Sequence, residues 1–163
     1  MLNLFAPDVR QSAGLLFLKG HKILVLKRSK RTRNGGKWGL PGGRIDQDES
    51  WYRAARRESA EELKTVPEHG IVGSITVHRS HRLYAIFACR GSKKALGSWQ
   101  PELNHEHDDW RWVNYAWIRA HQDKLHPVLQ RIIVDKTGRK WIRSMMKQRT
   151  QKPLHGGRRS TDQ

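Results

Sequence analysis

The 163-residue sequence has one cysteine, few acidic residues and no long apolar run. The single Cys89 excludes an internal disulfide, which is typical of a chain that works in a reducing compartment. The longest apolar stretches, such as residues 13–18, are far shorter than the roughly 20 residues of a membrane-spanning helix. No secretory signal is visible at the N-terminus. These absences predict a cytoplasmic protein with no membrane partner.

Positive charge is the largest departure from average composition. There are 32 lysines and arginines against 15 aspartates and glutamates, a formal net charge of +17 at pH 7. The excess is uneven, because residues 19–37 carry eight basic and no acidic side chains, and residues 137–163 carry eight basic side chains and one aspartate. The other 117 residues are nearly neutral. This distribution indicates an anionic ligand or partner near these two segments.

Short apolar runs predict a domain in which strands alternate with helices. Residues 12–18 and 23–27 are strand-length runs, and the link Lys19-Gly20-His21 between them suits a hairpin. Residues 28–37 are basic, contain glycines and lack apolar periodicity, so they are expected to form a mobile loop. The remaining expected strands are residues 71–79, 82–90 and 110–113.

A helix is predicted to begin after Ser50, whose hydroxyl suits an N-cap. Its packing face is a narrow stripe of residues at helical spacing, and Pro67 requires that it end earlier. The stripe contains Tyr52, Ala55, Ser59 and Leu63. A second helix is expected over residues 128–135, opened by Pro127.

The C-terminal segment is expected to differ from the rest. Apolar residues at positions 141–146 recur at helical spacing among basic ones, which predicts a short basic amphipathic helix. From residue 151 onward the composition favours disorder. We therefore expect one domain over residues 1–136 and a basic extension over residues 137–163, helical at first and then disordered.

Three glutamates lie on one side of the first predicted helix. Glu58, Glu61 and Glu62 have the spacing i, i+3, i+4, so their like charges repel one another. A divalent cation would reverse the sign of this interaction, since Mg²⁺ prefers carboxylate oxygens and substrate phosphates. Arg57, four residues before Glu61, is placed to hold one carboxylate in an ion pair. The pattern predicts a magnesium site next to a glycine turn.

The stretch from residue 43 to residue 62 resembles the signature of the Nudix hydrolases, G-x5-E-x7-R-E-U-x-E-E-x-G-U, where U is apolar. The six fixed residues that match are Gly43, Glu49, Arg57, Glu58, Glu61 and Glu62. At average residue usage such a match arises by chance about once in 10⁷ starting positions. The sequence departs from the signature at Ser59, Lys64 and Thr65. Since Lys64 replaces a glycine, the helix is expected to end differently there.

The resemblance implies an α/β fold, a Nudix-like α/β/α sandwich with a mixed sheet and a loop-helix-loop catalytic motif. It implies Mg²⁺ as the cofactor, with Mn²⁺ as an alternative. The implied metal ligands are the side chains of Glu58, Glu61 and Glu62 and the carbonyl group of Gly43.

Further roles are implied by the same resemblance. Glu49 and Arg57 are expected to be structural parts of the motif. The general base in the family comes either from the motif or from a later acidic loop. The candidates here are therefore Glu58, Glu106 and Asp108, and Glu106 is preferred among the loop residues because it best matches the acidic position of the family.

The implied activity is that of a hydrolase acting on phosphoric anhydride bonds. Its substrate is a nucleoside diphosphate linked to another moiety, as in a nucleoside triphosphate, a dinucleoside polyphosphate or ADP-ribose. Two alternatives are an RNA 5′-end hydrolase acting on a cap or triphosphate, and a non-catalytic RNA-binding protein on a Nudix scaffold. In both, the basic tail contacts RNA.

Substrate phosphates are expected to bind the basic loop, and a base could stack on a tryptophan. The predicted substrate-binding residues are Arg28, Lys30, Arg31, Arg33, Lys37 and Trp110. Residues 105–109, His-Glu-His-Asp-Asp, also permit another interpretation as a transition-metal cluster, because alternate residues of an extended segment face one side.

Overall fold

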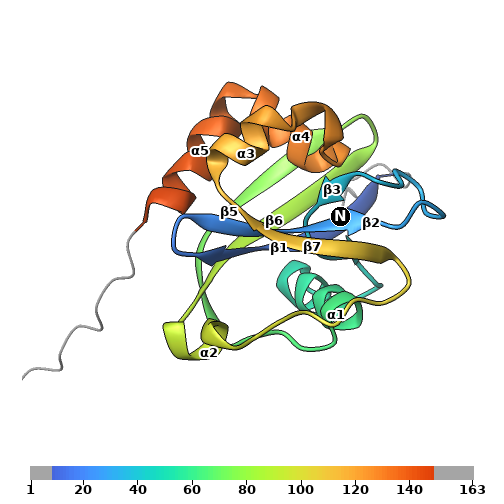
Figure 1. The fold of residues 1–163 in the computed structure, drawn as a ribbon. Coiled ribbons are helices and arrows are strands. Elements are labelled where there is room, and N and C mark those ends of the chain that lie inside the picture. The colour runs from blue at the N-terminus through green and yellow to red at the C-terminus, as the bar shows by residue number, and fades with distance from the viewer. Residues whose placement is uncertain (1–8, 149–163) are drawn as a thin grey trace, which may run out of the picture.

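The structure, a computed structural model, describes residues 9–148. A seven-stranded sheet lies between two layers of helices, with α1 and α2 on one face and α3, α4 and α5 on the other (Figure 1). The strand order is β3-β2-β1-β6-β5, with β4 also paired to β1 and β7 to β2. β1 and β6 run parallel and the other pairs antiparallel. The predicted α/β/α sandwich with a mixed sheet is confirmed.

The elements follow one another along the chain without long connections. The strands are β1 (Arg10–Lys19), β2 (Lys22–Arg28), β3 (Trp38–Gly39), β4 (Gly42–Arg44), β5 (His69–Arg79), β6 (Arg82–Gly91) and β7 (His107–Val113). The helices are α1 (Trp51–Leu63), α2 (Lys93–Gly97), α3 (Tyr115–Ala120), the 3₁₀ turn η1 (Gln122–Lys124), α4 (Pro127–Val134) and α5 (Lys136–Lys147). None of the helices in this described part is both long and apolar enough to cross a bilayer.

The central strand β1 is buried on both faces because it lies between β2 and β6 under both helical layers. Alternate side chains point to opposite faces. Leu15 and Phe17 belong to the core under α1, whereas Leu16 and Leu18 belong to the core under α3, α4 and α5. The predicted hairpin to β2 is present, with Gly20 at φ 58° in its turn.

Helix α1 begins and packs as its sequence predicts. The Ser50 hydroxyl accepts a hydrogen bond from the Arg53 N–H, and Ala55, Ser59 and Leu63 are fully buried. At its end, Lys64 has φ 70° and ψ −49°, so the helix does not end on a left-handed helical residue as a glycine would allow. A positive φ at a non-glycine residue costs about 1 kcal/mol or more.

The C-terminal helix is longer than the sequence predicts and is part of the fold. α5 begins at Lys136, since the Asp135 carboxylate accepts a hydrogen bond from the Gly138 N–H at 2.9 Å and caps the helix. Its Ile142, Met145 and Met146 are buried in the core that α3 and α4 also line. The boundary at residue 136 and the basic tail stay predictions, and the disorder expected from residue 151 lies outside the described residues.

Candidate functional site

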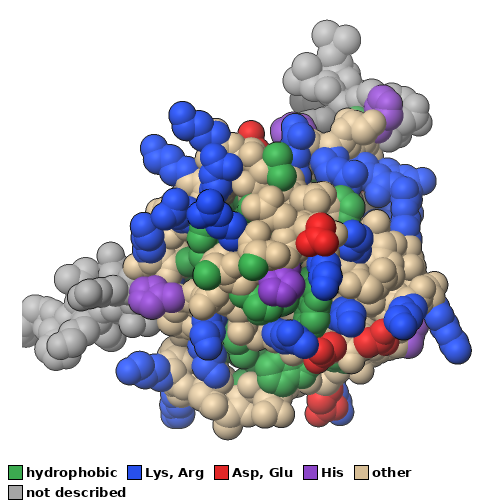
Figure 2. Space-filling view, turned by 45° about the horizontal axis from the view of Figure 1, so that its top comes forward, with side chains coloured by type: hydrophobic (Ala, Val, Ile, Leu, Met, Phe, Trp, Pro, Cys, Tyr) green, Lys and Arg blue, Asp and Glu red, His purple; other side chains and the backbone are tan. Residues whose placement is uncertain are grey.

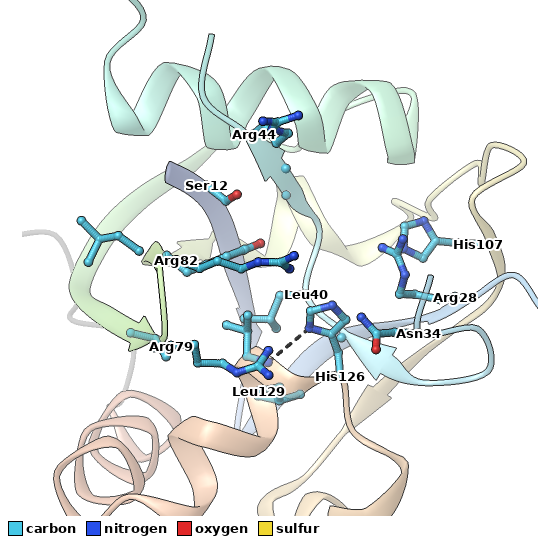
Figure 3. Close-up of a pocket in the computed structure, with 17 residues that line it drawn as sticks. Ser12, Arg28, Asn34, Leu40, Arg44, Arg79, Arg82, His107, His126 and Leu129 are labelled. Carbon is cyan, nitrogen blue, oxygen red and sulfur yellow. Dashed lines mark hydrogen bonds between the residues drawn. The ribbon is translucent and has the colours of Figure 1, made fainter. Parts of the chain in front are cut away.

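A pocket opens where the ends of several strands meet the start of α4. Its walls come from all seven strands, β1 to β7, and from the first residues of α4 with the segment that enters it. In Figure 3, Arg28 and His107 lie side by side at one wall, while Arg82 and His126 point toward the middle of the pocket. Because the residues that line the pocket come from all seven strands and from α4, only the folded sheet assembles them.

The acidic face of α1 meets this pocket at the glycines of β4. Gly42 and Gly43 line the pocket, and the Gly42 N–H donates a hydrogen bond to the Glu62 carboxylate at 3.1 Å. A Cβ on Gly43 would lie 2.5 Å from the Cδ and Oε2 atoms of Glu58. Two of the three predicted metal-binding carboxylates therefore touch the backbone that forms the pocket wall.

Arg57 holds the motif together with its guanidinium group. Nε and Nη2 donate to the two carboxylate oxygens of Glu49 at 2.8 and 2.9 Å. Nη1 donates to Glu58 at 2.9 Å and to Glu61 at 3.2 Å, and Nη2 also donates to the Arg44 carbonyl at 3.0 Å. A bidentate pair with further bonds from one planar group sets both position and orientation. Arg57 thereby aligns two of the glutamates with strand β4.

Burial shifts the proton affinity of the two glutamates that lie against the glycines of the pocket wall. Glu62 is 2% exposed, and this burial raises its pKa well above its ordinary value, with the nearby Glu106 and Glu58 adding to the shift. Burial also raises the pKa of Glu58, against the opposing effect of its bond to Arg57. A cation bound here would stabilise the charged carboxylates that burial disfavours.

A second acidic segment approaches Glu62 from the start of β7. Glu106 and His107 each place one ligand atom in a group with Glu62 whose atoms all lie within 4.8 Å of one another. His107 is 6% exposed, and its Nδ1 atom has no hydrogen-bond partner among residues 9–148. Carboxylates and an unpartnered imidazole in one place form a donor set that fits a divalent cation.

The positive charge in the pocket comes from arginines rather than histidines. Burial is the main cause that lowers the pKa of His107 to about 4 and that of His126 to about 4, so both rings are neutral near pH 7. Arg28, Arg44 and Arg82 line the same cavity. At neutral pH the pocket is therefore lined by charged guanidinium groups, while the carboxylates of Glu62 and Glu58 lie against Gly42 and Gly43 of its wall.

The other predicted site residues lie outside this pocket. Lys30 and Arg31 are exposed on the loop, and Lys37 donates to the Asp123 carbonyl at 2.6 Å. Trp110 packs against the core under α1. Asp108 is exposed on β7 and does not belong to the cluster of Glu62, Glu106 and His107.

Arg79 and Arg82 are pocket residues that sequence reasoning missed. They flank the two-residue turn between β5 and β6 and pair directly with each other across the hairpin. A signal was present in the sequence, since two arginines bracket a predicted turn. The net charge of the central region is nearly neutral, so composition alone does not single these arginines out.

Gly43→Ala is expected to lower activity at this site by about ten- to a hundredfold while leaving the folding stability nearly unchanged. The new methyl group displaces the Glu58 carboxylate, the flexible end of a side chain, and a shift of about 1 Å in a reacting group can cost a hundredfold in rate. Turnover and the thermal midpoint of unfolding are measured together. Gly97→Ala is the matched control, because a Cβ there meets nothing within 4 Å. Full activity of Gly43→Ala would refute the proposed closeness of Gly43 and Glu58.

Glu49→Gln is expected to destabilise the protein near neutral pH and much less in acid. Its hydrogen bonds to Arg57 lower the pKa of Glu49 to about 2, below the ordinary value of 4.5. The charged carboxylate therefore stabilises the fold above about pH 4.5, and this contribution is lost as the pH falls toward about 2. Urea unfolding of both proteins at about pH 7 and about pH 3 measures the difference. The exposed Glu102→Gln variant is measured as a control. If the difference in unfolding free energy between Glu49→Gln and the parent protein does not become smaller in acid, the assignment is wrong.

Comparison with known proteins gives consistent matches. The profile of the NUDIX domain matches residues 8–135. The bis(5′-nucleosyl)-tetraphosphatase (asymmetrical) of Caenorhabditis elegans is 29% identical over 83 residues, which cover 46% of this chain and 56% of that protein. The aligned region thus spans little more than half of this relative.

Two of the solved structures with the same fold illustrate the similarity. The MutT protein from Methanosarcina mazei Go1 has a TM-score of 0.63 and 24% identity, with coverage of 85% of this chain and 96% of the other. An Ap4A hydrolase of Caenorhabditis elegans in a binary complex has a TM-score of 0.57 and 18% identity, with coverage of 85% and 93%. At these sequence identities the similarity shows a shared fold and nothing more.

Proposed function

The chain belongs to the NUDIX domain family, and on that premise we propose that it is a Mg²⁺-dependent pyrophosphohydrolase. Its substrate would be a nucleoside diphosphate linked to another moiety. The observation that carries the proposal is the buried Glu62 carboxylate, which shares one cluster with Glu106 and His107 at a pocket lined by arginines. Nucleoside phosphates and divalent cations are the ligands that such a pairing of charges suits.

The donor set fits a hard divalent cation. Glu58 and Glu62 lie against Gly43 and Gly42 of the pocket wall, and Glu106 lies close to Glu62, while Glu61 is half-exposed. The Gly43 carbonyl is a further proposed ligand. Mn²⁺ is a suitable alternative to Mg²⁺, because it accepts the imidazole of His107 as well as carboxylates. When bound, the cation supplies charge neutralisation and a more acidic water molecule.

Protein side chains would position the substrate and accept a proton from the attacking water. Arg57 keeps Glu58 and Glu61 in place through its bonds to both. Arg28 and Arg82 would neutralise the phosphate oxygens, which lowers the barrier to attack by water. Glu106 is the proposed general base, since it lies close to Glu62 whereas Asp108 lies outside that cluster.

A substrate panel tests the proposal. Phosphate or nucleotide release is measured for nucleoside triphosphates, ADP-ribose and dinucleoside polyphosphates, with Mg²⁺, with Mn²⁺ and with a chelator. Dinucleoside polyphosphates come first, because the name of the Caenorhabditis elegans relative is bis(5′-nucleosyl)-tetraphosphatase. We expect metal-dependent turnover of at least one member and none with the chelator. A complete lack of turnover would reject the function.

A further inference from the structure

A basic groove continues outward from the pocket. It is lined by Arg33, Arg79, Arg82 and Arg131 together with His78, and we call this set the basic groove. The groove and the pocket share Asn34, Arg79 and Arg82, so the two are continuous. No acidic side chain of the described residues lines the groove.

The fold holds these arginines close together at a cost. Arg79 pairs directly with Arg82 across β5 and β6, and Arg10 pairs directly with Arg82 across β1 and β6. Like charges in directly opposed positions destabilise a sheet. Within residues 9–148, no carboxylate forms a salt bridge with any of the four groove arginines, Arg33, Arg79, Arg82 and Arg131. An anionic ligand in the groove would relieve this repulsion.

The positive surface extends beyond the groove to α5. A shallow cleft between β5 and the α4–α5 junction shares His78 and Arg131 with the groove and reaches Gly138 of α5. Asp135 also lines this cleft, but its carboxylate caps α5. The solvent face of α5 then presents Lys136, Arg139, Lys140, Arg143 and Lys147. Figure 2 shows this helical side of the molecule, where lysine and arginine side chains clearly outnumber aspartate and glutamate.

The dimensions favour a long anion over a small nucleotide. The 12 residues of α5 alone span about 18 Å at 1.5 Å per residue, and the groove and the pocket add to that length. No residue of α5 lines the pocket or the basic groove, so an anion held in the pocket alone does not contact the basic face of α5. Arginines match backbone phosphates with paired hydrogen bonds, which is common in nucleic-acid recognition.

The burial pattern of α5 disfavours a membrane as the occupant. Amphipathic helices bind bilayers by inserting their apolar face. In α5 that face, with Ile142, Met145 and Met146, is already buried in the protein core. The exposed residues of the helix are charged or polar. A nucleic-acid backbone, which is a chain of phosphodiesters, can bind to such a charged face without inserting into an apolar surface.

We infer that the basic groove and the exposed face of α5 bind the backbone of a single-stranded nucleic acid, whose 5′ phosphates enter the pocket. The inference rests on the proposed function only for what happens at the 5′ end. Binding along the groove and α5 is a separate property, and it is measured without turnover.

Fluorescence anisotropy of the full chain tests the inference. The probes are 3′-labelled single-stranded RNA and DNA of about 12 nucleotides, each with a 5′-triphosphate or a 5′-hydroxyl, over a series of salt concentrations. Arg131→Gln/Lys140→Gln is expected to weaken binding about tenfold and to lower the salt slope by about 1 to 2. The triphosphorylated strands are expected to bind several-fold more tightly than the hydroxyl strands.

The matched control is Arg53→Gln/Arg56→Gln, which removes the same charge from exposed positions of α1. Equal weakening by the control would show that net charge alone attracts the strand, and this would overturn the inference. Equal affinity for both 5′ ends would overturn the placement of the 5′ phosphates. Binding to anionic vesicles with the same dependence on Arg131 and Lys140, without binding to strands, would identify a membrane surface instead.

The two proposals fail separately. Strand binding that depends on Arg131 and Lys140, in a protein without turnover on any nucleotide, would reject the hydrolase and keep the inference. Nucleotide hydrolysis with strand binding that ignores both substitutions would reject the inference and keep the hydrolase.

Discussion

Glu62→Gln is expected to reduce Mg²⁺-dependent hydrolysis about 10³-fold. The Glu62 carboxylate is 2% exposed, and its one hydrogen bond among the described residues comes from the Gly42 N–H at 3.1 Å. It is thus the most buried of the motif glutamates and the one that shares a cluster with Glu106 and His107. Glutamine keeps the shape but removes the charge that a cation needs. Initial rates at saturating Mg²⁺ measure the effect.

The same substitution is expected to raise the thermal midpoint of the metal-free protein near neutral pH. Burial raises the folded-state pKa of Glu62 above its value in the unfolded chain. The carboxyl group therefore contributes stability below the unfolded pKa, and this contribution is lost as the pH rises through the folded pKa. Glutamine stays neutral and avoids that loss. A metal-induced increase of the midpoint should also disappear in Glu62→Gln.

Glu102→Gln is the control for Glu62, because Glu102 is exposed and pairs only with Lys64 in the described structure. It should leave turnover and the response to Mg²⁺ unchanged. Near-normal turnover of Glu62→Gln would remove Glu62 from the metal site. If Glu62→Gln is inactive but its metal-free thermal midpoint is raised, the loss of activity is not caused by unfolding.

Glu106→Gln is expected to lower kcat about 10²-fold, while Asp108→Asn is expected to change it less than about threefold. Both residues belong to the same acidic segment, in which the resemblance to the family already favours Glu106. Glu106 lies with Glu62 and His107, whereas Asp108 is exposed on β7 outside that cluster. The pH dependence of kcat is measured for both variants and the parent protein.

A general base predicts that the acidic limb of the pH profile is lost in Glu106→Gln and kept in Asp108→Asn. If Asp108→Asn instead shows the larger loss of kcat, the general base is Asp108 on β7 and the assignment to Glu106 is wrong. Circular dichroism of both variants serves as the check on folding.

Much of the local structure follows from short-range patterns. The Ser50 cap and the buried stripe of Ala55, Ser59 and Leu63 are encoded within one segment of 14 residues, so helix α1 was predictable. The β1–β2 hairpin is equally local, with its glycine in the turn. Helices α2 and α3 were missed because they have five and six residues, too few to display a helical period.

The boundary between α4 and α5 shows how tertiary contacts alter a local prediction. The apolar spacing predicts a helix only around residues 141–146, but α5 begins at Lys136 and passes through Gly138, where it packs closely against α4. A Cβ at this position would lie 2.5 Å from the Ile132 carbonyl oxygen. Glycine therefore permits close packing here, and a helix-breaking preference of about 1 kcal/mol is outweighed by core burial.

By itself, the sequence determined the carboxylate pattern of the motif, because Glu58, Glu61, Glu62 and their brace Arg57 are spaced by the geometry of one helix. Only the tertiary structure decided which other groups join them. Glu106 reaches Glu62 across 44 positions because β7 pairs with β2, and Arg79 and Arg82 reach the pocket because β6 pairs with β1. Contacts of this kind depend on sheet topology, which no local spacing encodes.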